Sequence, residues 1–134
     1  MVMLDYDVKI LMVWGEAIKG NQKFLDWLLN NGFPELSALA HSIRGSEKAF
    51  QWLMENGYPE LAALDHAIDE RKAAYEWLAK HDYKFLVVFA DACQNKPAAI
   101  RWLIQSDLKI FLHLSKVIRE LRNNQTFDYH KLHF

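Results

Sequence analysis

Large apolar residues recur along this chain with a period of 25 residues. The tryptophans of this pattern, each followed by a leucine, are Trp27, Trp52, Trp77 and Trp102. Further apolar columns, meaning residues at the same place in successive units, lie nine, twelve and sixteen residues after each tryptophan. A fixed period of this length indicates a repeat protein. The sequence therefore predicts one domain over residues 1–134, with repeats at 2–26, 27–51, 52–76, 77–101 and 102–126 and a tail at 127–134.

Each unit contains two predicted helices. Within residues 46–56 the apolar residues lie three and four apart, which is the spacing of one helix face. Ser46 suits the N-cap of this helix, and Gly57 suits the position after its last turn. Pro59 and Glu60 suit the first turn of a second helix. The core face of that second helix would carry Leu61, Leu64 and Ile68.

The predicted fold class is all-α, because no segment alternates between apolar and polar residues with period two. Helices of about 11 residues are marginal alone, so successive pairs must stack to bury a continuous core. The expected architecture is an α-solenoid of five helix-turn-helix repeats with about ten short antiparallel helices. The tryptophans would form a buried ladder along the stack, with Trp52 and Trp77 mostly buried; the alternative is a ligand cage.

The stretch from Ala49 to Gly57 resembles the second helix of an ankyrin repeat, where an aliphatic run ends in glycine, and residues 27–32 do so too. An ankyrin repeat has 33 residues including a β-turn finger, so loss of the finger leaves about the length seen here. Asp82 and Asp107 replace the glycine in units four and five. The chain thus resembles an ankyrin-like α-solenoid without β-hairpins, with short HEAT-like units as the alternative. This resemblance implies that the protein binds other proteins.

Composition and charge narrow the functional classes. The net charge is −1 and the hydrophobic fraction is 51%, as in an ordinary globular domain. Residues 101–134 carry six basic and three acidic side chains, an asymmetry too mild for a nucleic-acid footprint. The N-terminus lacks a signal-peptide pattern, and the longest apolar run, from Phe85 to Ala90, is too short to span a membrane. We therefore expect a cytoplasmic protein that binds neither nucleic acid nor membranes.

The sequence predicts no enzyme, no cofactor and no metal site. Catalytic and phosphate-binding motifs are absent. His41 and His66 share one column, and neighbouring helix axes lie about 8–10 Å apart, which argues against a shared zinc ion. His130 and His133 lie three residues apart without an evident third ligand. The lone Cys93 occupies a column of isoleucines, so we expect a small buried residue.

A charged cluster in the third unit allows two interpretations. Asp65, His66, Asp69 and Glu70 follow one another on one predicted helix. Carboxylates beside a histidine can perform acid–base chemistry. A solvated helix face explains them with fewer assumptions, and we expect that.

The outer units carry extra apolar residues where the middle units are polar or small. Eight and ten residues after the tryptophan, units two and three have glutamate with serine or alanine, whereas units one, four and five are apolar. Exposed apolar patches usually mark interfaces. The predicted partner-binding residues are Phe85, Val87, Ile110 and Leu112. The tail could instead fold back as a cap over this surface.

Three functions remain open on the sequence. The first is a non-enzymatic protein-interaction module or scaffold that uses one face of the helical stack. The second is a helical-repeat nucleic-acid-binding protein. The third is a structural protein that self-associates into a homo-oligomer through the repeat ends.

Overall fold

The computed structural model describes the backbone of residues 3–132 and the side chains of residues 3–125. Over that range the chain is helical and contains no strand, which confirms the predicted all-α class. No helix of this part is long and apolar enough to cross a membrane. The helices are α1 (Val8–Ile18), α2 (Gln22–Asn30), α3 (Pro34–Ile43), α4 (Glu47–Glu55), α5 (Pro59–Ile68), α6 (Lys72–Lys80), α7 (Lys84–Cys93), α8 (Pro97–Gln105) and α9 (Lys109–Leu132).

The residues predicted to cap the helices have the expected geometry. The Ser46 hydroxyl accepts a hydrogen bond from the N–H of Ala49 at 3.2 Å, as an N-cap does. After α4, Gly57 has a φ of +86°, and the N–H of Tyr58 reaches the carbonyl of Leu53 at 2.9 Å. This pair of features is a Schellman helix end.

A residue with a left-handed backbone conformation, meaning a positive φ, follows each of the first eight helices. These residues are Gly20, Gly32, Gly45, Gly57, Glu70, Asp82, Asn95 and Asp107. Asp82 and Asp107 have φ values of 63° and 55°, so they hold the glycine conformation without being glycine. Aspartate and asparagine tolerate this region better than most residues. The turn geometry therefore recurs every 25 residues even where the glycine is lost.

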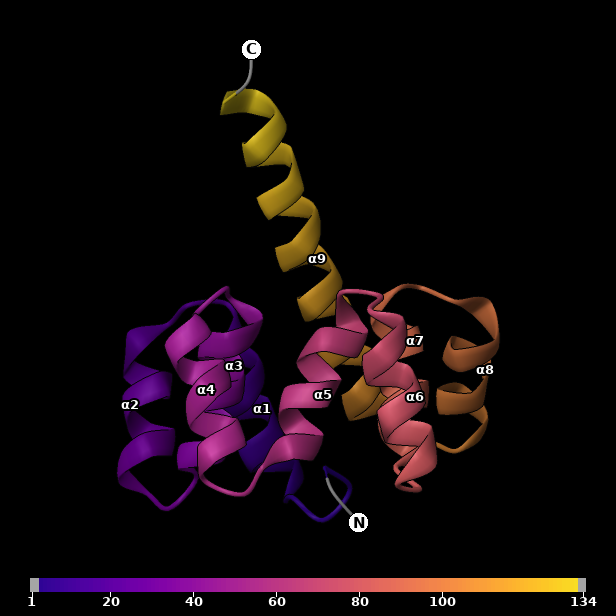
Figure 1. Ribbon diagram of the computed structural model, residues 1–134, viewed down its shortest axis with the longest axis horizontal. Helices are drawn as coiled ribbons and strands as arrows, with labels where there is room; N and C mark the ends of the chain where they lie inside the picture. The colour runs from indigo at the N-terminus through magenta and orange to yellow at the C-terminus, as the bar shows by residue number, and fades with distance from the viewer. Residues whose placement is uncertain (1–2, 133–134) are drawn as a thin grey trace.

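The odd-numbered helices form an inner ring. α1, α3, α5 and α7 each pack against the next odd-numbered helix, and α9 packs against α1. The even-numbered helices lie outside, each in contact with the two inner helices that it connects. In Figure 1 the segment before α1 lies at one end of this ring, and α9 extends beyond the opposite end. The stack of helices is thus closed on itself, a curvature that the sequence did not predict.

The core of the ring comes from the inner helices. The column twelve residues after each tryptophan is completely buried and consists of Trp14, Leu39, Leu64, Phe89 and Leu114. The leucine after each tryptophan is also completely buried, whereas Trp27 and Trp102 remain 40% and 42% exposed. Trp52 and Trp77 are partly buried and pack against the core, as expected, but the completely buried residue of each Trp-Leu pair is the leucine. The tryptophans therefore do not form the continuous buried ladder that the sequence predicts.

Each of the first three column tryptophans packs on an aromatic residue six positions later. Trp52 stacks on Tyr58 with ring centroids 5.9 Å apart. Trp77 stacks on Tyr83 at 5.8 Å, and Trp27 stacks on Phe33 at 6.3 Å. The rings cover the turn from an outer helix into the next inner helix, so they stabilise each turn locally.

Aromatic contacts cross the interior of the ring. The rings of Trp14 on α1 and Phe89 on α7 lie 6.4 Å apart, and Phe89 meets Phe111 on α9 edge-on at 5.6 Å. Gly15 lets α1 come close to α9, since a Cβ there would lie 3.1 Å from Cδ2 of Leu114. Side chains of the first and last inner helices therefore meet in the interior and close the ring.

The last helix departs from the repeat. About ten short helices were expected, but the described chain has nine, because α9 continues without a break to Leu132. Figure 1 shows its second half rising away from the ring. The predicted cap at residues 127–134 is not what this backbone forms up to Leu132, and residues 133–134 lie outside the described part.

Trp14→Ala should be far more destabilising than Trp102→Ala. Trp14 is completely buried at the centre of the ring, so its loss leaves a cavity and should lower the free energy of unfolding by about 3–5 kcal/mol. Trp102 is 42% exposed, and its loss should cost about 1 kcal/mol. Urea unfolding of both variants measures the difference. Equal losses would contradict the placement of Trp14.

Candidate functional site

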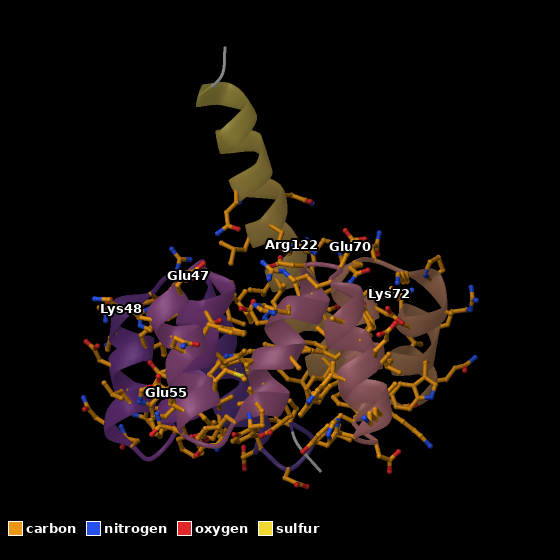
Figure 2. The ribbon with its side chains drawn as sticks, in the orientation of Figure 1. Glu47, Lys48, Glu55, Glu70, Lys72 and Arg122 are labelled. Atoms are coloured by element: carbon orange, nitrogen blue, oxygen red, sulfur yellow. The ribbon has the colours of Figure 1, made fainter. Side chains whose placement is uncertain are left out.

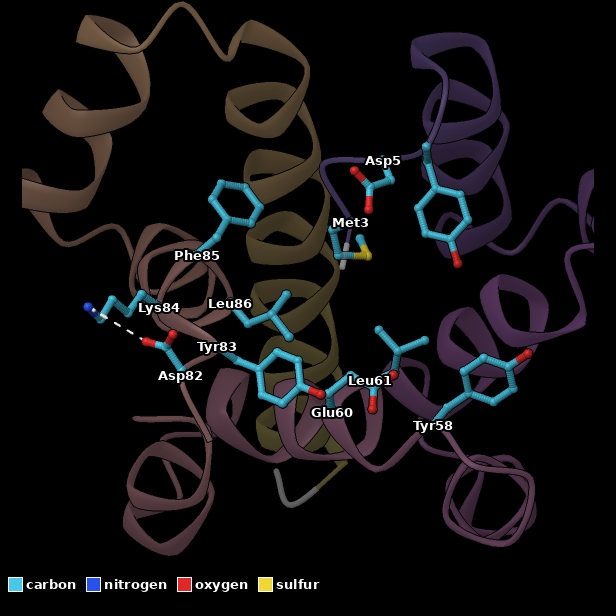
Figure 3. A pocket seen from close by; sticks show the side chains of 11 residues that line it. Met3, Asp5, Tyr58, Glu60, Leu61, Asp82, Tyr83, Lys84, Phe85 and Leu86 are labelled. Carbon is cyan, nitrogen blue, oxygen red and sulfur yellow. Dashed lines mark ion pairs between the residues drawn. The ribbon is translucent and has the colours of Figure 1, made fainter. Parts of the chain in front are cut away.

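One hollow lies at the pole where the inner helices begin, which we call the N-terminal pole. Its volume is about 550 Å³. Three segments line it: the chain before α1, the start of α5 and the start of α7. The lining residues are Met3, Asp5, Tyr6, Tyr58, Glu60, Leu61, Asp82, Tyr83, Lys84, Phe85 and Leu86. Figure 3 shows Met3, Leu61 and Leu86 around its centre.

The 25-residue period places equivalent residues side by side in this hollow. Tyr58 and Tyr83 both precede the first turn of an inner helix, and Leu61 and Leu86 both lie one turn later. The two leucines are 1% exposed, and the two tyrosines are half-buried. The stacking of each tyrosine on its tryptophan fixes the position of the phenol. Residues 25 positions apart in the sequence therefore supply two matching sides of the hollow.

The chain before α1 closes one side of the hollow. Met3 is completely buried and has a φ of +72°. The Tyr6 hydroxyl donates a hydrogen bond to Oε1 of Glu35 at 2.8 Å, and Glu35 is itself buried. Burial, followed by the adjacent Glu35 carboxylate, raises the pKa of the Tyr6 phenol. This bond ties the segment before α1 to the first turn of α3.

The rim of the hollow carries more negative than positive side chains. Asp5, Glu60 and Asp82 bring carboxylates, and Lys84 is the one cation among the lining residues. Nζ of Lys84 lies 3.6 Å from Oδ1 of Asp82, and both side chains are more than 80% exposed. Figure 3 shows this pair at the edge, away from the buried leucines. The site thus combines an apolar base with an acidic rim.

The sequence did not single out this hollow. Of the four residues predicted to bind a partner, Phe85 lines it, and Val87, Ile110 and Leu112 do not. Phe85 is 5% exposed and meets the ring of Phe111 edge-on at 4.8 Å. It therefore forms a packed wall of the hollow, and its partner role stays a prediction. The other three are half-buried against the core, and a partner role for them stays a prediction.

The opposite pole, where the inner helices end, is held together by side chains that bind helix carbonyls. Arg44 donates to the carbonyl of Ile18 at 2.9 Å, and Arg119 donates to that of Ala92 at 2.7 Å. Gln94, in the same column, donates to the carbonyl of Ala67 at 2.8 Å. Each of these residues caps the inner helix of the preceding unit.

Asp69 holds the same column after α5, but its carboxylate cannot donate such a bond. Arg122 from α9 adds a second donor at the end of α5, because it bonds to the carbonyl of Ile68, and its Nε lies 3.5 Å from Oδ1 of Asp69. Figure 2 shows Arg122 at this pole. Arg122 and Glu70 both line a surface hollow there. A residue of the last helix thus caps the third inner helix.

The charged cluster of α5 is not the fully solvated face that the sequence predicts. Asp65 is 7% exposed, and its Oδ2 accepts a hydrogen bond from the Ser42 hydroxyl at 2.5 Å. Burial raises the pKa of the Asp65 carboxyl to about 6, although the Ser42 hydrogen bond opposes this shift. His66 stacks on Phe50 with ring centroids 4.1 Å apart. Asp69 and Glu70 are exposed, as expected.

Cys93 is 1% exposed, as predicted, and burial raises the pKa of its thiol. Within the described part, no group of three His, Cys, Asp or Glu side chains is placed to hold a metal ion. The side chains of His130 and His133 lie outside that part.

Comparisons of the chain with protein-family models, curated proteins and solved structures find no match.

Replacement of Asp65 should change how stability depends on pH. The folded pKa of about 6 exceeds the ordinary value of 3.8, so the folded state holds this proton more tightly than the unfolded state. The Asp65 contribution to the free energy of unfolding should therefore fall as pH rises from about 4 to about 6, by about 2–3 kcal/mol. Asp65→Asn should remove this loss and be relatively more stable at neutral pH. Denaturation of both proteins across this pH range measures their free energies of unfolding. A constant difference between the wild type and Asp65→Asn would contradict the raised pKa of Asp65.

Proposed function

We propose that the protein is a non-enzymatic interaction module that receives a short segment of a partner protein in the hollow at the N-terminal pole. The segment would carry a basic side chain next to an apolar one. The observation that carries this proposal is the combination of an apolar base, formed by Leu61, Leu86 and Met3, with an acidic rim.

The size of the hollow supports this proposal. Ligand sites commonly have volumes of about 300–1,000 Å³ and are mostly apolar with a few polar groups. The hollow has about 550 Å³ and is built mainly on large apolar and aromatic side chains. An apolar partner side chain that leaves water here gains about 25 cal/mol for each Å² buried. Few of the groups in the hollow need to move, since the lining leucines and Met3 are already packed.

The charges favour a cationic partner over an anionic one. The N-termini of α5 and α7 carry partial positive charge, which would attract an anion. Against this stand three carboxylates on the rim, and the one lysine is paired with Asp82. The carboxylates carry full charges, so the rim as a whole favours a lysine or arginine. Such charge complementarity sets specificity and association rate more than total affinity.

The repeat interpretation is part of the same proposal. We infer five ankyrin-like helix-pair units without β-hairpins, the last of which is incomplete. This inference is supported by the left-handed residues at 25-residue spacing and by the buried columns of the inner helices. Repeat proteins of this kind usually present a face of the stack to other proteins.

The nucleic-acid alternative has less support. Basic side chains that could contact phosphates include Arg44, Arg119 and Arg122, and all three donate hydrogen bonds to main-chain carbonyls of the ring. Binding to phosphates would compete with these helix caps.

A cytoplasmic location is compatible with the interaction module and belongs to the proposal.

A set of labelled peptides tests the interaction module. A short peptide with a lysine between leucines should bind, and replacement of its lysine by glutamate, or of its leucines by serine, should weaken binding at least about tenfold. Glu60→Lys in the protein should weaken binding of the lysine peptide by a similar factor, because it reverses the charge of the rim. Fluorescence anisotropy measures these affinities.

Glu47→Lys is the matched control, since Glu47 is exposed on α4 and does not line the hollow. Figure 2 shows Glu47 on the side of the molecule where Arg122 lies, away from the N-terminal pole. Circular dichroism verifies that both variants fold. Equal binding of the lysine and glutamate peptides, or equal losses in the two protein variants, would refute the proposed site.

A further inference from the structure

The ring has five seams between neighbouring inner helices, and outer helices cover four of them. α2 covers the seam between α1 and α3, α4 the next, α6 the third and α8 the fourth. The fifth seam joins α9 to α1 by direct contact, and within residues 3–132 no outer helix lies over it. One side of the ring is therefore built differently from the other four.

This difference leaves apolar side chains of α1 exposed. Val8 and Met12 are 54% and 55% exposed, although both lie on an inner helix. Their equivalents in the other units are covered by the outer helix that comes before: Tyr58 stacks on Trp52, and Ser37 donates a hydrogen bond to the carbonyl of Leu25 at 3.2 Å. No outer helix precedes α1 in the described chain, so the same two positions are open.

The period identifies the segment that matches this place. Residues 122–130 lie 25 positions after α8, and Phe127 falls on the tryptophan column. In the structure the backbone of these residues belongs to α9, which runs through position 120 without the left-handed turn found at Gly20, Gly45, Glu70 and Asn95. The chain therefore contains a fifth outer-helix segment, and that segment is directed away from its own ring (Figure 1).

Two arginines hold α9 in this direction. Arg119 binds the carbonyl of Ala92 at 2.7 Å, and Arg122 binds the carbonyl of Ile68 and pairs with Asp69 at 3.5 Å. A turn at residue 120 would displace Arg122 and leave the carbonyl of Ile68 without this donor. Occupation of the open seam by the same chain would thus cost the contacts that tie α9 to α5.

We propose that a second copy of the chain covers the seam: residues 122–132 of one copy lie over the junction of α9 and α1 of the other, in contact with Val8 and Met12. The exchange is reciprocal, so a two-fold dimer satisfies both open seams and both projecting helices. A projecting helix of this length is marginal alone, and packing in the partner's seam stabilises it. The hollow at the N-terminal pole takes no part, so the proposal does not depend on the peptide site.

Sedimentation velocity over a wide concentration range tests the dimer. The wild type should form a dimer, and Met12→Lys should raise its dissociation constant at least about tenfold, because a charge would enter the covered seam. The matched control is Met54→Lys, which changes a methionine of α4 that is 49% exposed. The control should dimerise like the wild type, and circular dichroism verifies folding of both variants.

Crosslinking identifies the segment that lies over the seam. Val8→Cys combined with Phe127→Cys, treated with a bismaleimide, should give a covalent dimer on a denaturing gel. The wild type is the background, because its one thiol, Cys93, is buried. A monomeric wild type, equal effects of the two lysine variants, or a crosslink formed only within one chain would overturn the proposal.

Discussion

α1 packs directly against α9, and the rest of the structure depends on this contact. In an open stack, the first and last inner helices would each expose one apolar flank. Here Gly15 allows the backbone of α1 to approach Leu114, and Trp14 reaches Phe89 across the interior. Every inner helix consequently has a neighbour on both sides, and the central column is completely buried in all five units. Closure also sets the inner helices side by side in one direction, which creates two poles of different chemistry.

The two poles follow from the polarity of the inner helices. At the N-terminal pole, the first turns of α5 and α7 bring tyrosines, leucines and carboxylates around one hollow. At the other pole, the free carbonyls of the helix ends need donors, and Arg44, Gln94 and Arg119 supply them from the next unit. The first pole therefore gathers side chains around a hollow, whereas the second uses its side-chain donors to complete the fold.

Local patterns in the sequence predicted the elements well and their arrangement poorly. Helix ends such as Ser46 and Gly57 follow from backbone chemistry within a few residues, so they could be predicted. The tryptophans were assigned to the core because adjacent Trp and Leu both look like core residues, and only the packing decides which of the two is completely buried.

Closure of the ring could not be predicted, since it depends on small rotations between neighbouring helix pairs that no residue pattern specifies. Leu121, which stands where other units have Asn21 or Ser46, could have indicated the uninterrupted α9. The hollow was missed because its lining comes from three separate segments, one of which lies before the first helix.

A double-mutant cycle at Gly15 and Leu114 tests ring closure most directly. In the closed ring, Gly15→Leu overpacks the contact and should lower the free energy of unfolding by about 1–3 kcal/mol. Leu114→Ala makes room at the same place, so the double variant should be at least about 1 kcal/mol more stable than the sum of the single losses predicts. If α1 and α9 were apart, Gly15→Leu would instead stabilise the helix by up to about 1 kcal/mol. That gain, together with additive effects of the two substitutions, would contradict the closed ring.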